Sequence, residues 1–188
     1  MTSDRIKVLR VGVFIDGSNM LWGSRASGIR IDWEKMRTYL KNRFNVVVLN
    51  FYAGEDNSPK PEHLQRSLNQ KKFHRKLEKL GYSLIRKPLK HMASGAIKCD
   101  MDIEITMDIR TYENDIDCII LLSGDSDYLP VVDYYWKTGK HIRIFAFKES
   151  LSWELRTFCL NKPRCNFKQI HEIRKEIERA EEDPSFPQ

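Results

Sequence analysis

Two long apolar runs that each end in an acidic polar turn constrain the fold of this chain more than any other feature. The first run covers residues 7–15 and leads into Asp16-Gly-Ser-Asn19. The second covers residues 117–122 and leads into Ser123-Gly-Asp-Ser-Asp127. Mostly apolar, β-branched runs of this kind predict strands that are buried on both faces.

The remaining chain alternates between strand-like and helix-like segments. Strands are predicted at residues 7–15, 45–53, 82–86, 117–122 and 141–147, and helices at 32–40, 62–80, 102–112, about 127–138 and 152–160. This alternation predicts an α/β fold in which helices cover both faces of a central, mostly parallel sheet, a three-layer α/β/α sandwich. Residues 87–99 are expected to form a basic connection.

The length and the apolar pattern limit the class of protein. A chain of 188 residues favours one domain. Its longest apolar stretches are far shorter than the roughly 18 residues of a membrane helix, and residues 1–10 lack the apolar core of a signal peptide. We therefore expect a cytoplasmic protein with no membrane partner. A homo-oligomer is compatible with the sequence.

Cysteine and histidine are not placed as ligands of a soft metal. The four cysteines form no Cys-x-x-Cys pair and have no histidine at zinc-finger spacing. The five histidines show no ligand-like pairing either. Reduced, mostly structural thiols are expected.

The charges are divided between the two halves of the chain. Residues 1–99 contain 20 Lys and Arg against 8 Asp and Glu, whereas residues 100–188 contain 12 against 18. Ten acidic residues and a single basic one, Arg110, lie within residues 100–133. The acidic segment could hold a divalent cation, and the basic half could bind a polyanion.

The acidic turns predict where such a cation would bind. If the two apolar strands are neighbours, Asp16 and Asp125 emerge at the same edge of the sheet, with Asp127 close by and Asp102 at the start of a helix. Several carboxylates without a lysine between them suit Mg²⁺ or Mn²⁺. Each aspartate also has a local explanation, as a turn residue, a helix cap or a partner of the helix dipole.

Three sequence blocks resemble the signature blocks of the NYN domain, a family that includes the LabA-like proteins and belongs to the PIN-like superfamily. They are Val13-Phe-Ile-Asp-Gly-Ser-Asn19, Lys98-Cys-Asp-Met-Asp-Ile103 followed by Asp108, and Leu121-Leu-Ser-Gly-Asp-Ser-Asp-Tyr-Leu-Pro130. The resemblance runs from about Val8 to Phe147 and implies a Rossmann-like, PIN-like fold. We expect this domain to cover residues 1–172 and residues 173–188 to form a charged C-terminal tail.

The resemblance also implies an activity and a set of site residues. PIN-like proteins are generally taken to be metal-dependent ribonucleases. Asp16, Asp102, Asp125 and Asp127 match the acidic metal-binding and catalytic set, and Asn19 matches its polar companion. The middle block differs from the family pattern, so either Asp100 or Asp102 can stand at the family's aspartate. We favour Asp102 because Asp108 then keeps its usual spacing.

Substrate binding is expected from the basic half of the chain. The candidate residues are Lys72, Arg75, Lys76, Lys79, Arg86, Lys87, Lys90 and Lys98, together with Trp22 as a surface for an unpaired base and Ser123 as a group that orients a water or a phosphate. A solvated helix face, a core tryptophan and a turn serine are the corresponding alternatives.

Two functions fit these features. The first is a Mg²⁺- or Mn²⁺-dependent ribonuclease, in which carboxylate-bound metal activates water and hydrolyses RNA phosphodiester bonds in an acidic cleft, most simply as an endonuclease. The second is an RNA-binding regulatory module that has the same fold and little or no turnover.

Other acidic-site classes of α/β protein fit less well. A haloacid-dehalogenase-type phosphatase needs an aspartate at position 18, which is Ser18. A receiver domain needs a lysine at the end of its last strand, whereas Lys140 stands at the start of that strand. The chain has no Gly-x-x-x-x-Gly-Lys loop for nucleotide triphosphates.

Overall fold

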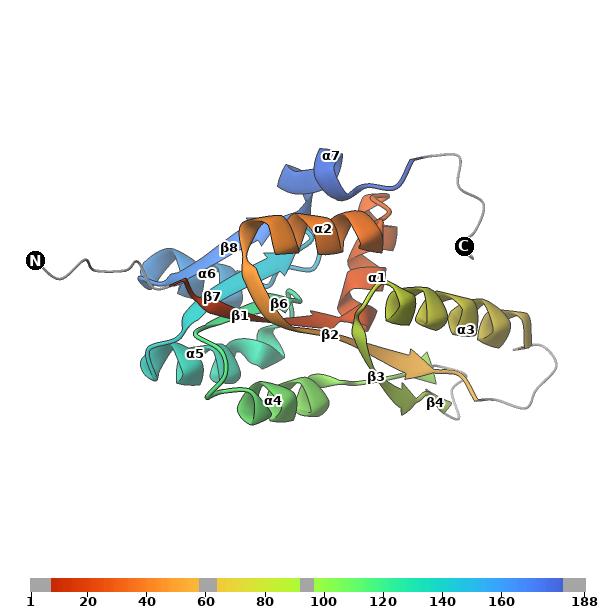
Figure 1. Ribbon diagram of the computed structural model, residues 1–188, viewed down its shortest axis with the longest axis horizontal. Helices are drawn as coiled ribbons and strands as arrows, with labels where there is room; N and C mark the ends of the chain where they lie inside the picture. Colours follow the sequence, from red (N-terminus) through yellow and green to blue (C-terminus); the bar gives the residue numbers. More distant parts are fainter. Residues whose placement is uncertain (1–7, 58–63, 92–96, 181–188) are drawn as a thin grey trace, which may run out of the picture.

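A six-stranded parallel sheet forms the centre of the computed structural model, which describes residues 8–57, 64–91 and 97–180 (Figure 1). The strand order is β3-β2-β1-β6-β7-β8. Their bounds are β1 (Arg10–Asp16), β2 (Asn45–Glu55), β3 (Ser83–Pro88), β6 (Cys118–Leu122), β7 (His141–Ala146) and β8 (Cys165–Gln169). Each pair of neighbours in this sheet is parallel. The predicted α/β class and parallel sheet are confirmed.

The strand order reverses between β1 and β6, the two strands that carry the acidic turns. From β1 the chain builds the sheet outward through β2 and β3, then returns to β6 and builds the other half. Val11 pairs with Cys118 and Ile15 with Leu122, so the two strands end level with each other. Asp16, the last residue of β1, and Ser123, the residue after β6, therefore emerge at the same edge, where sites form in sheets of this type.

Helices cover both faces of the sheet, because the strands are apolar on both sides (Figure 1). The first face packs against α1 (Gly17–Ser27), α2 (Trp33–Arg43), α3 (Leu64–Lys79) and α7 (Arg174–Ile177). The second packs against α4 (Asp102–Thr111), α5 (Leu129–Lys137) and α6 (Trp153–Asn161). Alternate residues of β1 supply the two cores, with Val13 in the first and Phe14 in the second. This is the predicted three-layer arrangement.

Four elements differ from the sequence-based expectation. Helix α1 begins directly after Asp16, where the sequence indicated only a polar turn. The basic connection contains β4 (Lys90–His91) and β5 (Ile97–Lys98), which pair antiparallel in a separate small sheet. Strand β8 was not predicted, because its burial pattern shows a single buried residue, Cys165, and thus no apolar alternation.

The chain continues to pack beyond residue 172. Ile173, at the end of the short helix η3 (Ile170–Ile173), and Ile177 in α7 are both buried in the core of the first face. The division into residues 1–172 and a tail of residues 173–188 stays a prediction. The first residues of that tail contribute to the domain core. None of the helices in the described ranges is long and apolar enough to cross a membrane.

Candidate metal centre

Asp16 ends β1 and caps the helix that follows. Its Oδ1 accepts hydrogen bonds from the backbone N–H groups of Ser18 and Asn19, both at 3.0 Å. A Cβ at Gly17 would lie 2.5 Å from the backbone oxygen of Tyr52, so only glycine fits where α1 begins against β2. The Asp16 side chain is thereby fixed and is 6% exposed.

The acidic loop, which we define as residues 123–127 after β6, is held by hydrogen bonds between its own residues. Ser123 is fully buried and its Oγ accepts from the N–H of Asp125 at 3.3 Å. Asp125 Oδ1 accepts from the N–H of Asp127 at 3.1 Å and so caps the short helix η2 (Ser126–Tyr128). The described contacts of Ser123 are thus made within the loop, and its predicted contact with substrate stays a prediction.

Asn19 connects α1 to the acidic loop. Its Oδ1 accepts a hydrogen bond from the backbone N–H of Gly124 at 3.1 Å, although the two residues are 105 positions apart. The side chain predicted to orient water or phosphate therefore ties the two acidic turns to each other in this structure.

Helix α4 brings Asp102 to the same edge. Its N-terminal end is fixed by a hydrogen bond of 3.2 Å from the N–H of Asp102 to Asp100 Oδ1. Six residues later, Asp108 Oδ2 accepts from the Tyr52 hydroxyl at 2.7 Å and from Asn50 Nδ2 at 3.3 Å, which anchors α4 to β2.

Three carboxylates converge at this edge. One ligand oxygen from each of Asp102, Asp125 and Asp127 lies within 4.8 Å of the others. Asp102 belongs to this group and Asp100 does not, and the choice of Asp102 as the site residue of the middle block stays a prediction. Asp16 is not in the group either, and its predicted role as a ligand stays a prediction.

Tyr128 links Asp16 to the three-carboxylate group. Its hydroxyl donates to Asp16 Oδ2 at 3.3 Å and also hydrogen-bonds to Asp102. The Tyr128 side chain is 1% exposed, so this contact is sealed from solvent. Sequence reasoning did not assign Tyr128 a role, although an aromatic residue directly after the Ser-Gly-Asp-Ser-Asp block was the available signal.

Burial and neighbouring carboxylates raise the pKa of two of the acidic residues, Asp102 and Asp16. Burial raises the pKa of Asp102 to about 6, and repulsion from Asp100 and Asp16 adds to this shift, while the hydrogen bond from Tyr128 opposes it. Burial also raises the pKa of Asp16, against the hydrogen bonds that it accepts from Asn19 and Tyr128. Such a set, built from oxygen ligands and carrying excess negative charge, fits a hard divalent cation.

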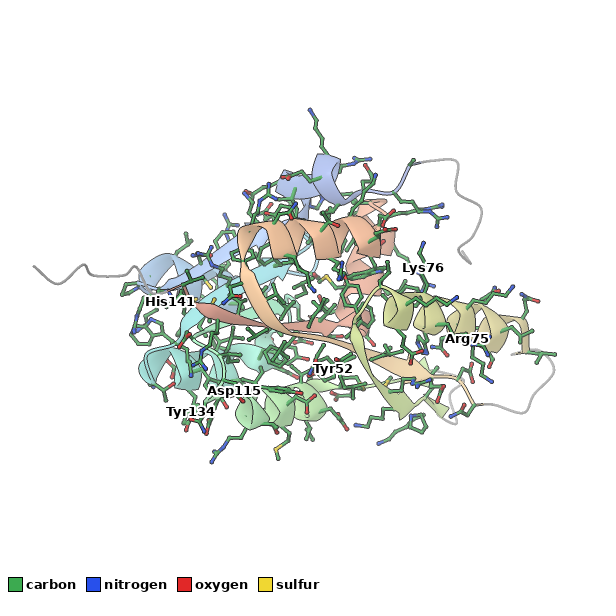
Figure 2. All side chains as sticks on the ribbon, viewed as in Figure 1. Tyr52, Arg75, Lys76, Asp115, Tyr134 and His141 are labelled. Atoms are coloured by element: carbon green, nitrogen blue, oxygen red, sulfur yellow. The ribbon has the colours of Figure 1, made fainter. Side chains whose placement is uncertain are left out.

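The predicted basic residues are distributed over several elements. Lys72, Arg75 and Lys79 are exposed on α3 and Lys76 is half-buried there, and Figure 2 shows Arg75 and Lys76 on different sides of the helix. Arg86 pairs with Glu55 at 3.6 Å and with Glu78 at 3.3 Å. These contacts therefore do not arrange the predicted basic residues into one continuous basic surface.

The other predicted substrate contacts lie closer to α4 or on α1. Lys87 Nζ contacts Glu104 at 2.6 Å and the Asp100 carbonyl at 3.0 Å, so Lys87 flanks the start of α4. Lys90 is exposed in β4, whereas Lys98 belongs to β5 and its side chain lies outside the described residues. Trp22 is 57% exposed on α1, so it is a surface residue and not part of the core.

The fold and the acidic edge together define an NYN domain: residues 10–161 match this family, and the chain belongs to it. The family is part of the PIN-like superfamily, as its sequence blocks indicated.

One curated protein and one solved structure are similar to this chain. The chain is 27% identical over 185 residues to the low amplitude and bright protein LabA of Synechococcus elongatus, an alignment that covers 94% of this chain and 92% of LabA. Its fold is similar to the crystal structure of a protein of unknown function from Vibrio parahaemolyticus, with a TM-score of 0.66, 23% identity and 99% coverage of both chains.

Proposed function

We propose that this chain is a Mg²⁺- or Mn²⁺-dependent ribonuclease that hydrolyses RNA phosphodiester bonds at the acidic edge of its sheet. The observation that carries the proposal is the convergence of Asp102, Asp125 and Asp127 at the strand-order reversal of an NYN domain. These three carboxylates would hold the cation, which when bound lowers the pKa of a coordinated water and offsets charge on the phosphate oxygens.

The chain's own residues keep the carboxylates ready for this task. Asn19 holds the acidic loop against α1, and Tyr128 places a hydroxyl between Asp16 and Asp102. The Asp108 anchor keeps the N-terminus of α4 at the sheet edge. A rigid ligand set of this kind is what a metal site needs in order to act on a bound phosphate.

RNA would be attracted by the exposed lysines and arginines of α3 and by Lys90. Lys87 is engaged with Glu104 and would have to exchange this partner for a phosphate. Trp22, exposed on the helix that begins at Asp16, offers a face on which an unpaired base can stack.

The decisive experiment uses end-labelled single-stranded RNA with purified protein in Mg²⁺, in Mn²⁺ and in EDTA. Asp125→Asn is the test variant, because asparagine keeps an acceptor for the N–H of Asp127 and removes the charge. Asp115→Asn, an exposed carboxylate outside the three-carboxylate group, is the matched control. We expect metal-dependent cleavage that Asp115→Asn retains and Asp125→Asn loses by at least about 100-fold.

The alternative function is an RNA-binding regulatory module with little or no turnover. It is favoured if the wild-type protein binds the labelled RNA and cleaves it in neither metal. Internal cuts on both 5′- and 3′-labelled RNA would identify an endonuclease, whereas stepwise shortening from one end would identify an exonuclease.

A further inference from the structure

Two buried cysteines lie side by side where α6 meets β8. Cys159 is in the last turn of α6 and Cys165 is the first residue of β8. Their Sγ atoms are 2.8 Å apart, and the residues are 5% and 6% exposed. A disulfide bond is about 2.0 Å long, so the two sulfur atoms need to move together by less than about 1 Å to form one.

The segment between the two cysteines is held in the conformation that brings them together. The N–H of Cys165 donates to the Lys162 carbonyl at 3.2 Å, and Trp136 Nε1 donates to the Pro163 carbonyl at 2.6 Å. Arg164 has a φ of 63° and its guanidinium donates to the Gly139 carbonyl at 3.1 Å. A left-handed residue that is not glycine persists only where its surroundings fix it.

The other two cysteines provide an internal comparison. Cys118 is buried in β6, and the thiol of Cys99 lies 3.9 Å from the Lys87 carbonyl. The hydrogen bond between the two thiols of the pair lowers the pKa of Cys159, and the thiolate is the form of cysteine that reacts with oxidants.

We propose that Cys159 and Cys165 form a reversible intramolecular disulfide when the protein reacts with hydrogen peroxide. The Cys159 thiolate attacks one peroxide oxygen, the O–O bond breaks and hydroxide leaves, which gives a sulfenic acid on Cys159. The Cys165 sulfur then attacks the Cys159 sulfur and displaces water. The two thiols lose two protons and two electrons, and the peroxide is reduced to two waters.

The disulfide would stabilise the position of α6, the helix that contacts the acidic loop. Helix α6 begins beside that loop, because the N–H of Ser152 donates to the Gly124 carbonyl at 2.8 Å. A covalent link between the other end of α6 and β8 anchors the helix in its native place. This modification site is independent of the proposed ribonuclease activity.

The test uses the C99S/C118S variant, which retains only the proposed pair. The folded variant is treated with hydrogen peroxide, digested with trypsin without a reductant and analysed by mass spectrometry. Cleavage after Arg156, Arg164 and Lys168 separates Cys159 from Cys165, because trypsin does not cleave at Lys162 before Pro163. We expect peptides 157–164 and 165–168 to be joined after peroxide treatment and to separate after dithiothreitol.

Three results would overturn the proposal: two intact thiols on the folded, treated protein, sulfinic or sulfonic acid at either cysteine, or a disulfide between two protein molecules. Oxidation is also expected to raise the Tm of C99S/C118S by roughly 5 °C, reversibly with dithiothreitol. An unchanged or lower Tm would mean that the bond does not fit the native fold. The wild-type protein, with the same two peptides, repeats the test without any substitution.

Discussion

The side-chain oxygen of Asn19 accepts a hydrogen bond from the backbone N–H of Gly124 at 3.1 Å. This contact joins the helix that begins after β1 to the loop that follows β6. Because Asp125 is the next residue, the position of one proposed metal ligand depends on a side chain that belongs to the other acidic turn. Asn19 is thus a positioning residue in this structure.

Replacement of Asn19 by alanine removes the acceptor of the Gly124 N–H. We expect Asn19→Ala to lower the free energy of unfolding by about 1–2 kcal/mol in urea denaturation and to reduce cleavage of labelled RNA. Asn42→Ala, an exposed change on α2, should stay within about 0.5 kcal/mol of the wild type. Full stability together with lost cleavage would instead show that Asn19 contacts water or substrate directly.

Replacement of Tyr128 by phenylalanine removes a hydroxyl and keeps the ring. Since the hydroxyl lowers the pKa of Asp102 and of Asp16, protons should compete better with metal in the variant. We expect calorimetric titration to show weaker Mn²⁺ binding at pH 6, with a smaller loss at pH 8. Tyr134→Phe, at a residue that is 50% exposed, is the control. Equal losses at both pH values would contradict a proton-linked effect.

The stability of the metal-free protein should depend on Asp102 between about pH 4 and pH 6. The folded-state pKa of about 6 lies above the ordinary value of 3.8, so the folded state binds this proton more tightly than the unfolded state does. Its stabilising contribution is present at low pH and is lost as the pH rises through this window. In EDTA, the Tm of the wild type should therefore fall relative to the Tm of Asp102→Asn as the pH rises from 4 to 7.

Asp115→Asn serves as the control for this pH series, because Asp115 is exposed and lies outside the three-carboxylate group. Its Tm relative to the wild type shows the effect of removing one exposed carboxylate outside this group. A constant difference in Tm between the wild type and Asp102→Asn would contradict the raised pKa of Asp102. Addition of Mn²⁺ at pH 7 should restore stability to the wild type and not to Asp102→Asn.

The lysines of α3 can be tested by the salt dependence of RNA binding. Lys72→Ala combined with Lys79→Ala removes two exposed charges, and Lys41→Ala combined with Lys175→Ala removes two elsewhere. Each phosphate contact contributes about 0.7 to the slope of log Kd against log salt for a single strand. We expect the α3 pair to reduce this slope by about 1.4 and the control pair to leave it unchanged. Identical slopes would place the RNA on another face.

The central strands were predictable because they are buried on both faces, which gives apolar runs that the sequence displays directly. Helix α1 was not predictable in this way, because it buries only Met20 and Gly23 and so shows no apolar stripe of helical period. Gly23 has a packing role instead: a Cβ there would lie 2.4 Å from the Phe147 ring. The edge strand β8 was missed for the same lack of pattern.

The acidic residues of the site were predictable because aspartates after adjacent strands must meet at one edge. Their supporting contacts were not, because they join residues far apart in the sequence. Tyr128 and Asp16 are 112 positions apart, and Tyr52 and Asp108 are 56 apart. No local pattern encodes such pairs, whereas the order of the strands, once known, brings the backbone segments together.

The close approach of Gly124 to the start of α6 gives the last prediction. A Cβ at Gly124 would lie 2.1 Å from the backbone oxygen of Ser150 and 2.7 Å from the Cα of Leu151, so the acidic loop or the segment before α6 must move. We expect Gly124→Ala to lower the free energy of unfolding by about 1–3 kcal/mol and to abolish metal-dependent cleavage.

Gly139→Ala separates a general loss of stability from a displaced acidic loop. Gly139 has a φ of 94° and its nearest neighbour for a Cβ is a side-chain nitrogen at 3.7 Å, so alanine there is strained in the backbone but makes no clash. Gly139→Ala should lower the free energy of unfolding by about 1 kcal/mol and preserve cleavage when the variant is assayed well below its Tm. If Gly124→Ala is also fully active under those conditions, the acidic loop tolerates a shift, and the three carboxylates do not require the spacing described here.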